Sequence, residues 1–454
     1  MKTDFTPSQL ADPAIAASEK ILRACVHCGF CTATCPTYVL LGDELDSPRG
    51  RIYLIKDMLE NDRPATAEVV KHIDRCLSCL ACMTTCPSGV HYMHLVDHAR
   101  LHIETTYRRP PSERLLRAVL ALVLPSPAWM RLSFALARLA RPFAALLPAS
   151  RQGATSPSLA DRLRAVLTLA PGRLPPKGTP AGHVIAAQGP RRGRVLLMQG
   201  CVQQVLAPDI NEATIRLLTR HGVEVVLAAD EQCCGALVHH MGRESEALAN
   251  ARANIDVWLD AADQGELDAI LITASGCGTM VKDYGFQLRG DSVYAERAAR
   301  VSALACDVTE YVARLDPPAT SPPRPLTVAY HAACSLQHGQ KITRQPKELL
   351  FKFGFVVKDI PEAHLCCGSA GTYNILQPDI ARRLRERKVV NIASVEPDVI
   401  ATGNIGCMVQ IASGTSTPVV HTIQLIDWAT GGPPPAALPA GALPVAALSS
   451  GGSR

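Results

Sequence analysis

The chain has 454 residues, 17 cysteines and a formal net charge of +5 at pH 7, and only 4% of its residues are aromatic. So mild a charge and so few aromatic side chains exclude a nucleic-acid surface built on base stacking. The length allows two to four domains, and the polar segment 1–20 lacks the apolar core of a signal peptide. Clustered cysteines in a long chain more often bind metal than pair as disulfides, so we expect a cytoplasmic metalloprotein.

Two cysteine strings, CVHCGFCTATCP at 25–36 and CLSCLACMTTCP at 76–87, share the spacing C-x2-C-x2-C-x3-C followed by proline. Bacterial ferredoxins have this spacing, and there the fourth cysteine of each string binds the cluster of the other. The strings therefore predict two neighbouring [4Fe–4S] clusters within a domain spanning 1–107, with electrons passing between them. The predicted ligands are Cys25, Cys28, Cys31 and Cys86 for cluster 1, and Cys35, Cys76, Cys79 and Cys82 for cluster 2.

Zinc is the alternative metal, but zinc sites usually combine two C-x2-C pairs across a longer loop. Eight thiolates already supply the cluster ligands, so the histidines near the strings are expected at the surface: His27, His72, His91, His94 and His98. Between the strings, Pro48 suits the first turn of a helix. Arg49 and Arg51 either offset the negative charge of the clusters or belong to a solvated helix start.

Residues 108–190 contain no cysteine and are rich in Arg, Pro, Ala and Leu, which predicts a helical connector. Pro125 and Pro127 interrupt its apolar run 115–148, leaving segments too short to cross a bilayer. Eight arginines and only two acidic residues lie between 100 and 141. A basic amphipathic helix of this kind could lie on an anionic membrane surface, or pack on a partner subunit or on the protein's own core.

Residues 191–430 contain two copies of one unit, in which short apolar strands alternate with helical segments. In both copies 32 positions separate the first cysteine from a Cys-Cys-Gly (CCG) triplet, and a last cysteine follows at similar spacing. The cysteines are Cys201, Cys233, Cys234 and Cys277 in the first unit, 191–318, and Cys334, Cys366, Cys367 and Cys407 in the second unit, 325–430. The matched spacing indicates a duplication, and the alternation predicts parallel α/β units.

We expect Cys201, Cys277, Cys334 and Cys407 at the strand ends, with the two CC pairs on adjoining loops, because sites gather at the carboxyl edge of open α/β sheets. Four sulfurs in each unit could hold a further iron–sulfur cluster, a zinc ion or redox-active thiols, or they could be buried structural residues. Cys306 lacks a counterpart in the repeat and is expected in the core. His331, His338 and His421 are expected to be packing residues rather than partners of a metal site. The tail, 431–454, is predicted to be disordered.

Two ferredoxin strings, the segment DSPRGRIYLIK (46–56) and two CCG units in this order resemble the family of glycolate oxidase (glycolate dehydrogenase) iron–sulfur subunits. The resemblance covers nearly the whole chain. Four segments of the CCG units make it specific to this family rather than to ferredoxin-like proteins in general: EQCCGALVHHMG, ASGCGTMVKDYG, YHAACSLQHGQ and HLCCGSAGTYN. It implies an α/β fold with a helical, ferredoxin-like 2[4Fe–4S] domain at the N-terminus. It also implies a subunit that is not catalytic alone and that relays electrons to membrane quinone, while flavin-containing subunits oxidise glycolate, and sometimes D-lactate, to the 2-oxo acid.

No G-x-G-x-x-G follows a predicted strand, so we expect flavin on the partner subunits and none on this chain. The same layout suits the equivalent subunit of a lactate or anaerobic glycerol-3-phosphate dehydrogenase, and the CCG units alone suit a thiol–disulfide reductase. In the related heterodisulfide reductase subunit a C-x-x-C pair ends each unit, but Met280 and Gln410 stand here in place of its last cysteine. The five-thiolate site of that family is therefore incomplete. The expected location is peripheral, on the cytoplasmic face of the cytoplasmic membrane.

Overall fold

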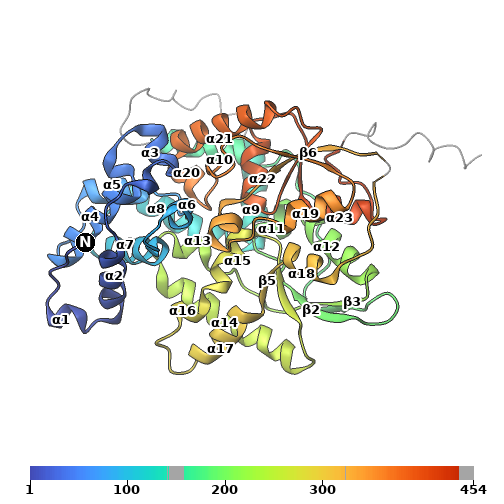
Figure 1. The fold of residues 1–454 in the computed structure, drawn as a ribbon, viewed down its shortest axis with the longest axis horizontal. Coiled ribbons are helices and arrows are strands. Elements are labelled where there is room, and N and C mark those ends of the chain that lie inside the picture. The colour runs from blue at the N-terminus through green and yellow to red at the C-terminus, as the bar shows by residue number, and fades with distance from the viewer. Residues whose placement is uncertain (141, 143–157, 323, 439–454) are drawn as a thin grey trace, which may run out of the picture.

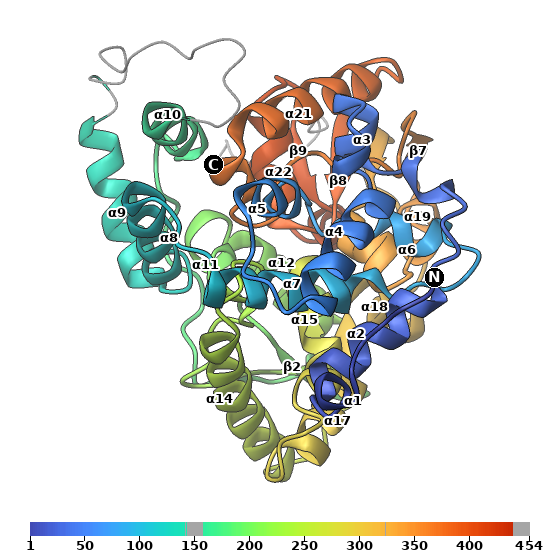
Figure 2. The same cartoon turned by 90° about the vertical axis from the view of Figure 1, so that its left-hand side faces the viewer.

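The computed structural model describes residues 1–140, 142, 158–322 and 324–438. A helical N-terminal domain lies against two α/β units, and the helices that follow it run along one side (Figures 1 and 2). The predicted α/β fold with a helical N-terminal domain and two duplicated units is confirmed.

Short helices surround the two cysteine strings of the N-terminal domain. Proline starts several of them, because its fixed φ and missing N–H suit a first turn. The predicted helix start at Pro48 is confirmed, and there the Ser47 hydroxyl accepts a hydrogen bond from the Gly50 N–H at 2.9 Å. The elements are α1 (Pro7–Leu10), α2 (Pro13–Ala24), η1 (Phe30–Thr32), α3 (Pro36–Leu41), η2 (Glu44–Asp46), α4 (Pro48–Glu60), α5 (Ala67–Asp74), α6 (Ala81–Thr85) and α7 (Tyr92–Thr106).

The predicted connector contains the helices α8 (Pro111–Val123), α9 (Pro127–Ala140) and α10 (Leu159–Leu169). It also contains a strand, β1 (His183–Ile185), which the sequence reasoning placed outside the first unit. β1 pairs antiparallel with β3 (Val223–Leu227) and forms the edge of the first sheet, so this sheet begins before residue 191.

Each unit is built on its own sheet. The first sheet has the order β1-β3-β2-β4-β5 and is parallel apart from β1, and the second has the order β7-β6-β8-β9 and is parallel throughout. The remaining strands are β2 (Gly193–Leu197), β4 (Ala269–Ile272), β5 (Ala305–Asp307), β6 (Thr327–His331), β7 (Val356–Asp359), β8 (Val399–Thr402) and β9 (Val419–His421).

Helices cover both sheets. Those of the first unit are α11 (Gln203–Leu206), α12 (Asp209–Arg220), α13 (Ala236–His239), α14 (Glu244–Asp263), α15 (Ser275–Lys282), α16 (Tyr284–Gln287), α17 (Ala295–Leu304) and α18 (Val308–Leu315). Those of the second are the π-helix η4 (Ser335–Gly339), α19 (Gln345–Lys352), α20 (Tyr373–Leu376), α21 (Pro378–Ala393), α22 (Ile405–Ala412) and α23 (Thr422–Ala429).

The two units share one apolar core. Side chains of β2 and β4 lie in the same buried cluster as those of β6 and β8, and α12 packs on α23 while α18 packs on α19. A buried carboxylate connects the units, because Asp427 of α23 binds Arg216 at 2.6 Å and Arg220 at 3.0 Å, both on α12. The duplicated halves therefore form one body.

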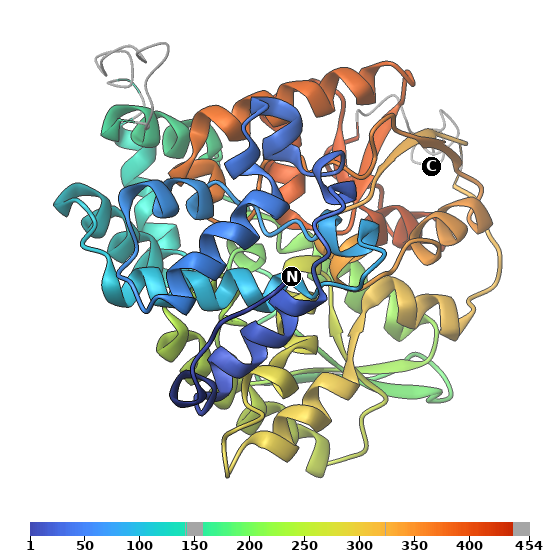
Figure 3. The same cartoon turned by 60° about the vertical axis from the view of Figure 1, so that its left-hand side comes forward.

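The N-terminal domain contacts both units (Figure 3). On the first unit, His94 Nε2 lies 2.9 Å from Asp283 Oδ1. On the second unit, the Tyr373 hydroxyl donates to the Arg75 carbonyl at 3.0 Å. These contacts hold the cysteine strings against the part of each unit that carries its CCG triplet.

The predicted disorder of 431–454 is tested only in part, because 439–454 lie outside the described residues. In the described part of the tail, Pro435 is buried and Leu438 packs against the core that the two units share. Pro435 and Leu438 therefore cover the end of that core, whereas most of the other residues of 431–438 are exposed.

No single helix among the described residues is long and apolar enough to cross a membrane. Only α8 and α9 pass that test together, and they bend by 120° at the break between them.

Candidate metal centres

Five cysteines from both strings line a first cavity, cavity 1, of about 440 Å³ including space open to solvent. They are Cys25, Cys28, Cys31, Cys82 and Cys86. Cys25 is buried whereas Cys28 is exposed, so the cavity lies near the surface. The lining contains the four cysteines predicted for cluster 1, together with Cys82, and that the four bind a cluster stays a prediction.

A second cavity, cavity 2, of about 330 Å³ has the complementary lining: Cys35, Cys76, Cys79 and Cys82. Cys82 also lines cavity 1, so a cysteine borders both cavities. Each string thus places its first three cysteines at one cavity and its fourth at the other, with Cys82 reaching both. This arrangement matches the crosswise ligation that the C-x2-C-x2-C-x3-C spacing predicts.

The two strings also have the same backbone conformation. Left-handed residues occupy matching positions, His27 and Gly29 in the first string (φ 57° and 84°) and Ser78 and Leu80 in the second (φ 48° and 63°). Three of the four carry side chains, for which this conformation is unfavourable. Such loops expose successive backbone N–H groups on one side, an arrangement that favours a negatively charged group. The repeated strain therefore fits two anionic clusters.

Buried polar groups around the cavities also fit bound iron–sulfur clusters. Tyr92 lines both cavities, and its buried hydroxyl finds no hydrogen-bond partner among the described residues. Burial raises the pKa of Cys31 to about 11 and the pKa values of Cys79 and Cys82 well above the usual range. Thiols that are costly to ionise by themselves become thiolates when a metal ion compensates the charge, so the residues present fit iron–sulfur clusters.

Arg51 lies beside cavity 2 and is 1% exposed. Its guanidinium donates to the Cys35 thiol at 3.8 Å and to the Thr37 hydroxyl at 3.0 Å. The buried Asp46 lies 3.5 Å away and also binds His72. The sequence allowed two interpretations of Arg49 and Arg51, either compensation of the cluster charge or a solvated helix start. The structure supports charge compensation at Arg51, whereas Arg49 is half-exposed and pairs with Glu44.

The predicted surface position of His72 is wrong. The side chain is 1% exposed, and its Nδ1 lies 2.9 Å from Asp46 Oδ1. His72 is buried because Asp46 is buried and needs hydrogen-bond partners. That partnership joins residues 26 positions apart, so the local sequence does not indicate it.

In the first unit the four predicted cysteines lie together. The Cys201 thiol donates to Cys233 at 3.4 Å, and Cys234 contacts Cys277. Hydrogen bonds from Cys201 and Cys234 hold the pKa of Cys233 well below its usual range. Cys233 is therefore easier to ionise than the thiols that surround it.

A buried carboxyl group near these thiols was not identified from the sequence. Glu231 accepts a hydrogen bond from the Gln199 N–H at 3.0 Å and another from the Trp258 indole at 3.3 Å. Burial raises the pKa of Glu231 to about 7, and the neighbouring Cys233 contributes to the increase. Its position two residues before the CCG triplet was the available signal.

The second unit repeats the arrangement. Cys334 lies 3.4 Å from Cys366, and Cys367 contacts Cys407. Cys366 packs in one cluster with Leu77 and Cys79 of the second ferredoxin string. Cys366 thus packs behind two residues that line cavity 2.

The glycine of each CCG triplet has a structural reason. Gly235 and Gly368 are left-handed, with φ of 88° and 90°, and a Cβ at either would lie 2.9 Å or 2.5 Å from the carbonyl oxygen of Ala247 or Ala381. Any larger residue would push the triplet away from the helix behind it, α14 or α21. Glycine therefore holds the two cysteines close to that helix.

Two predicted cysteine positions differ in detail. Cys277 and Cys407 lie in the first turns of α15 and α22 rather than at strand ends. The ladders stop at Ile272 and Thr402, because the neighbouring strands offer no partners beyond Asp307 and His421. The sulfurs still converge, because both helices start directly beyond the carboxyl edge of the sheet.

The remaining residues that were predicted to pack in the core are all buried, but they differ in their hydrogen bonds. Cys306 is buried in β5 as expected, and His338 and His421 are buried with hydrogen-bonded rings. His331 is different. It is 1% exposed, faces Cys367 and Cys407, and has no hydrogen bond to either ring nitrogen within the described part of the chain.

Comparisons with known proteins agree with these sites. Residues 21–90 match the 4Fe-4S dicluster domain, and residues 195–282 and 328–412 each match the Cysteine-rich domain called CCG. The fold and the cysteine sets therefore define an iron–sulfur protein with a dicluster domain and a duplicated cysteine-rich domain.

The chain is 42% identical to the glycolate oxidase iron-sulfur subunit of Escherichia coli K12 over 94% of this chain and 99% of that one. It is 31% identical to a probable glycolate oxidase iron-sulfur subunit of Bacillus subtilis 168, over 87% and 89%. The chain belongs to the family of glycolate oxidase iron–sulfur subunits.

Two more distant proteins are also similar to this chain, one in sequence and one in fold. Lactate utilization protein A of Exiguobacterium is 25% identical over 51% of this chain and 96% of that one. A crystal structure of a hypothetical protein from Helicobacter pylori has a TM-score of 0.51 at 9% identity, covering 94% of this chain and 74% of that one, and shows likeness of fold alone.

Proposed function

We propose that this chain is the electron-transfer subunit of a multi-subunit, flavin-dependent dehydrogenase that oxidises glycolate, with D-lactate as a second substrate, to the 2-oxo acid. The observation that carries the proposal is the pair of neighbouring cysteine-lined cavities that share Cys82. Iron–sulfur clusters held there would supply one-electron carriers. Flavin belongs to the partner subunits, and this chain passes electrons towards membrane quinone.

The names of the relatives favour glycolate over the other substrates. The E. coli glycolate oxidase iron-sulfur subunit matches 94% of this chain, whereas lactate utilization protein A matches 51% of it. The equivalent role in a lactate or glycerol-3-phosphate dehydrogenase is the second candidate. One relative is a lactate utilization protein, which supports this candidate. The candidate keeps the same electron-transfer chemistry and changes only the partner subunit.

Electrons enter most directly at cavity 1, because its lining reaches the surface. Cys28 is exposed there, and three large side chains beside it are exposed, namely Val26 by 66%, Phe30 by 62% and Tyr53 by 58%. Exposed apolar groups beside a redox site favour a docking protein. We assign this surface to a flavin-containing partner subunit.

The helices α8 and α9 are the candidate membrane contact. They expose a group of large apolar side chains: Leu115, Val119, Leu122, Trp129, Leu132, Leu136 and Leu139. Arg109 and Arg117 are buried and bind Asp74, so these two arginines serve the fold. The proposed surface is therefore mainly apolar, and it would hold the protein on the cytoplasmic side of the membrane. All 17 cysteines are free, which suits a reducing compartment.

Metal analysis of the full chain, purified without oxygen, tests the relay. We expect at least about eight irons and eight sulfides per chain, and an EPR signal after reduction that shows two interacting [4Fe–4S] clusters. A further four irons would place a cluster on the four thiols of the first unit. Replacing Cys28 by Ser should remove about one cluster, whereas Cys306→Ser, outside every cysteine set, should leave the iron content unchanged.

Protein that is colourless and free of iron and sulfide would overturn the relay. It would favour the thiol–disulfide reductase, for which the low pKa of Cys233 beside Cys234 is the supporting observation. A reductase needs no iron, so the same measurement separates the two functions.

A further inference from the structure

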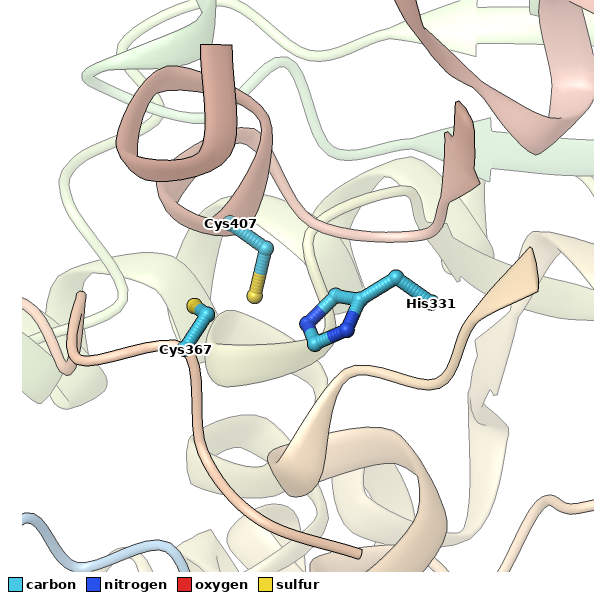
Figure 4. A group of neighbouring side chains, drawn as sticks. All are labelled: His331, Cys367 and Cys407. Carbon is cyan, nitrogen blue, oxygen red and sulfur yellow. The ribbon is translucent and has the colours of Figure 1, made fainter. Parts of the chain in front are cut away.

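Three buried side chains of the second unit gather around one point (Figure 4). His331 ends β6, Cys367 belongs to the CCG triplet and Cys407 lies in the first turn of α22. Their donor atoms all lie within 4.8 Å of one another, and the three residues are 1%, 0% and 2% exposed. Segments far apart in the sequence thus bring one nitrogen and two sulfurs together inside the protein.

The imidazole of His331 is the unusual member of this group. Both of its ring nitrogens lack a hydrogen-bond partner in the part of the chain that the structure describes. A buried polar group without a partner is costly. In the same unit, His338 bonds Thr84 at 2.7 Å and His421 bonds the Thr273 carbonyl at 2.8 Å, so buried histidines here are otherwise satisfied. The ring of His331 faces two thiols, which points to a missing partner between them.

The imidazole of His331 is already in the form that binds metal. Burial, and then the charge of Lys388, lower the pKa of His331 to about 3, so the imidazole is neutral. A neutral imidazole has a lone pair for a metal ion. A hydrogen bond with Cys366 lowers the pKa of the Cys367 thiol, but the hydrogen bond with Cys407 and burial raise it well above its usual range. This thiol therefore becomes a thiolate when a metal ion compensates the charge. Lys388 is 2% exposed and donates to the Glu362 carbonyl at 2.7 Å.

The repeat supplies an internal comparison. His331 and Met198 both lie three residues before the first cysteine of their unit. Lys388 and Asn254 likewise lie seven residues after the alanine that contacts the CCG glycine. The first unit therefore has four sulfurs without the histidine or the buried cation. The two units share a fold but differ in donor chemistry.

We propose that His331, Cys367 and Cys407 bind a single Zn²⁺ ion. Mixed nitrogen and sulfur donors in a small tetrahedral shell are typical of zinc. Bonds of about 2.0–2.3 Å place such donors roughly 3.5–3.8 Å apart, so a small closure of the present group suffices. Cys366, whose thiol contacts that of Cys367, supplies a sulfur for the fourth position.

The ion has a structural role that does not depend on the proposed relay. Zinc has no redox chemistry, so it would carry no electrons. It would fix the CCG triplet to β6 and α22. Because Cys366 of this triplet packs against Leu77 and Cys79, the ion would also stiffen one wall of cavity 2.

Metal analysis and zinc X-ray absorption on the full, anaerobically purified chain test the site. The wild type should contain about one zinc with a mixed nitrogen and sulfur shell. His331→Ala should lower the zinc content at least about tenfold while the iron content stays unchanged. Met198→Ala, the matched change in the first unit, should alter neither metal.

A second variant keeps the test decisive if His331→Ala fails to fold. His331→Cys should retain zinc and change its shell to sulfur alone. Wild-type protein without zinc, zinc that persists in His331→Ala, or a wild-type shell of sulfur alone would each overturn the proposal. Iron and zinc are counted separately, so failure of this site and failure of the relay give different results.

Discussion

At the scale of single residues, Arg51 shows how the chain can set the behaviour of cavity 2. Its guanidinium contacts Cys35 at 3.8 Å and is buried, so solvent screens its charge only weakly. Reduction of a cluster adds negative charge, and a nearby cation favours that state. Arg51 should therefore raise the reduction potential of cluster 2.

Replacing Arg51 by Met should lower that potential by about 100 mV. A unit charge at about 6 Å and an effective dielectric near 20 contributes about 3 kcal/mol, which is of that order for one electron. EPR-monitored redox titration of the loaded protein measures the shift. Arg49→Met is the matched control for cluster 2, because Arg49 lines cavity 1 rather than cavity 2 and pairs with Glu44, so its effect on the potential of cluster 2 should be much smaller. Equal shifts in both variants would contradict the argument.

Residue-level prediction from the sequence goes furthest where chemistry dictates spacing. The eight cysteines of the two strings line two neighbouring cavities, and their assignment as cluster ligands stays a prediction. His331 was interpreted as a packing residue and Lys388 was not identified, because their surroundings depend on what faces them across the fold. Comparing equivalent positions of the two copies would have revealed both, since Met198 and Asn254 occupy those positions in the first unit.

At the scale of secondary-structure elements, α8 and α9 present apolar side chains that the fold leaves uncovered. Leu132, Leu136 and Leu139 of α9 are exposed by 49%, 58% and 71%. Inserting three leucines into the headgroup region would contribute about 1.5–3 kcal/mol each if fully buried. This is the energetic basis of the proposed membrane contact.

Changing these three leucines to Ser should weaken binding to anionic vesicles at least about 100-fold, because each loses apolar contact with lipid. Co-sedimentation of the loaded protein with vesicles measures it. Phe351→Ser is the control, since Phe351 is 76% exposed on the second unit and distant in sequence from α9. Unchanged binding of the leucine variant would assign α8 and α9 to a protein partner instead.

The elements themselves were largely predictable. Alternating apolar runs and helical segments indicated α12, β3 and β7 with nearly their observed bounds. The starts of α15 and α22 were missed, because an apolar run does not show where a neighbouring strand ends. β1 was missed because only three residues pair there.

At the scale of the whole molecule, Asp427 connects the two units. Its carboxylate is 1% exposed and binds Arg216 and Arg220, which are themselves partly exposed. The sequence places these residues more than 200 positions apart, so their contact depends on how α12 packs on α23. No local pattern indicated this packing.

Asp427→Asn should destabilise the folded protein by about 2 kcal/mol, because two arginines lose their buried partner. Calorimetry at a fixed scan rate should show an unfolding temperature lower by a few degrees. Asp316→Asn should have almost no effect, since the Asp316 side chain is 82% exposed in its pair with Lys352. A larger loss in the control would contradict this account.

The shared lining of the two cavities has a consequence for biosynthesis. Cys86 of the second string lines cavity 1 and Cys35 of the first string lines cavity 2, so each half of the N-terminal domain supplies part of the lining of the other half's cavity. With the predicted crosswise ligation, neither half would complete a four-cysteine site by itself. While the ribosome makes the chain, the first site would then be completed only after the second string has emerged, and loss of either string would remove both sites.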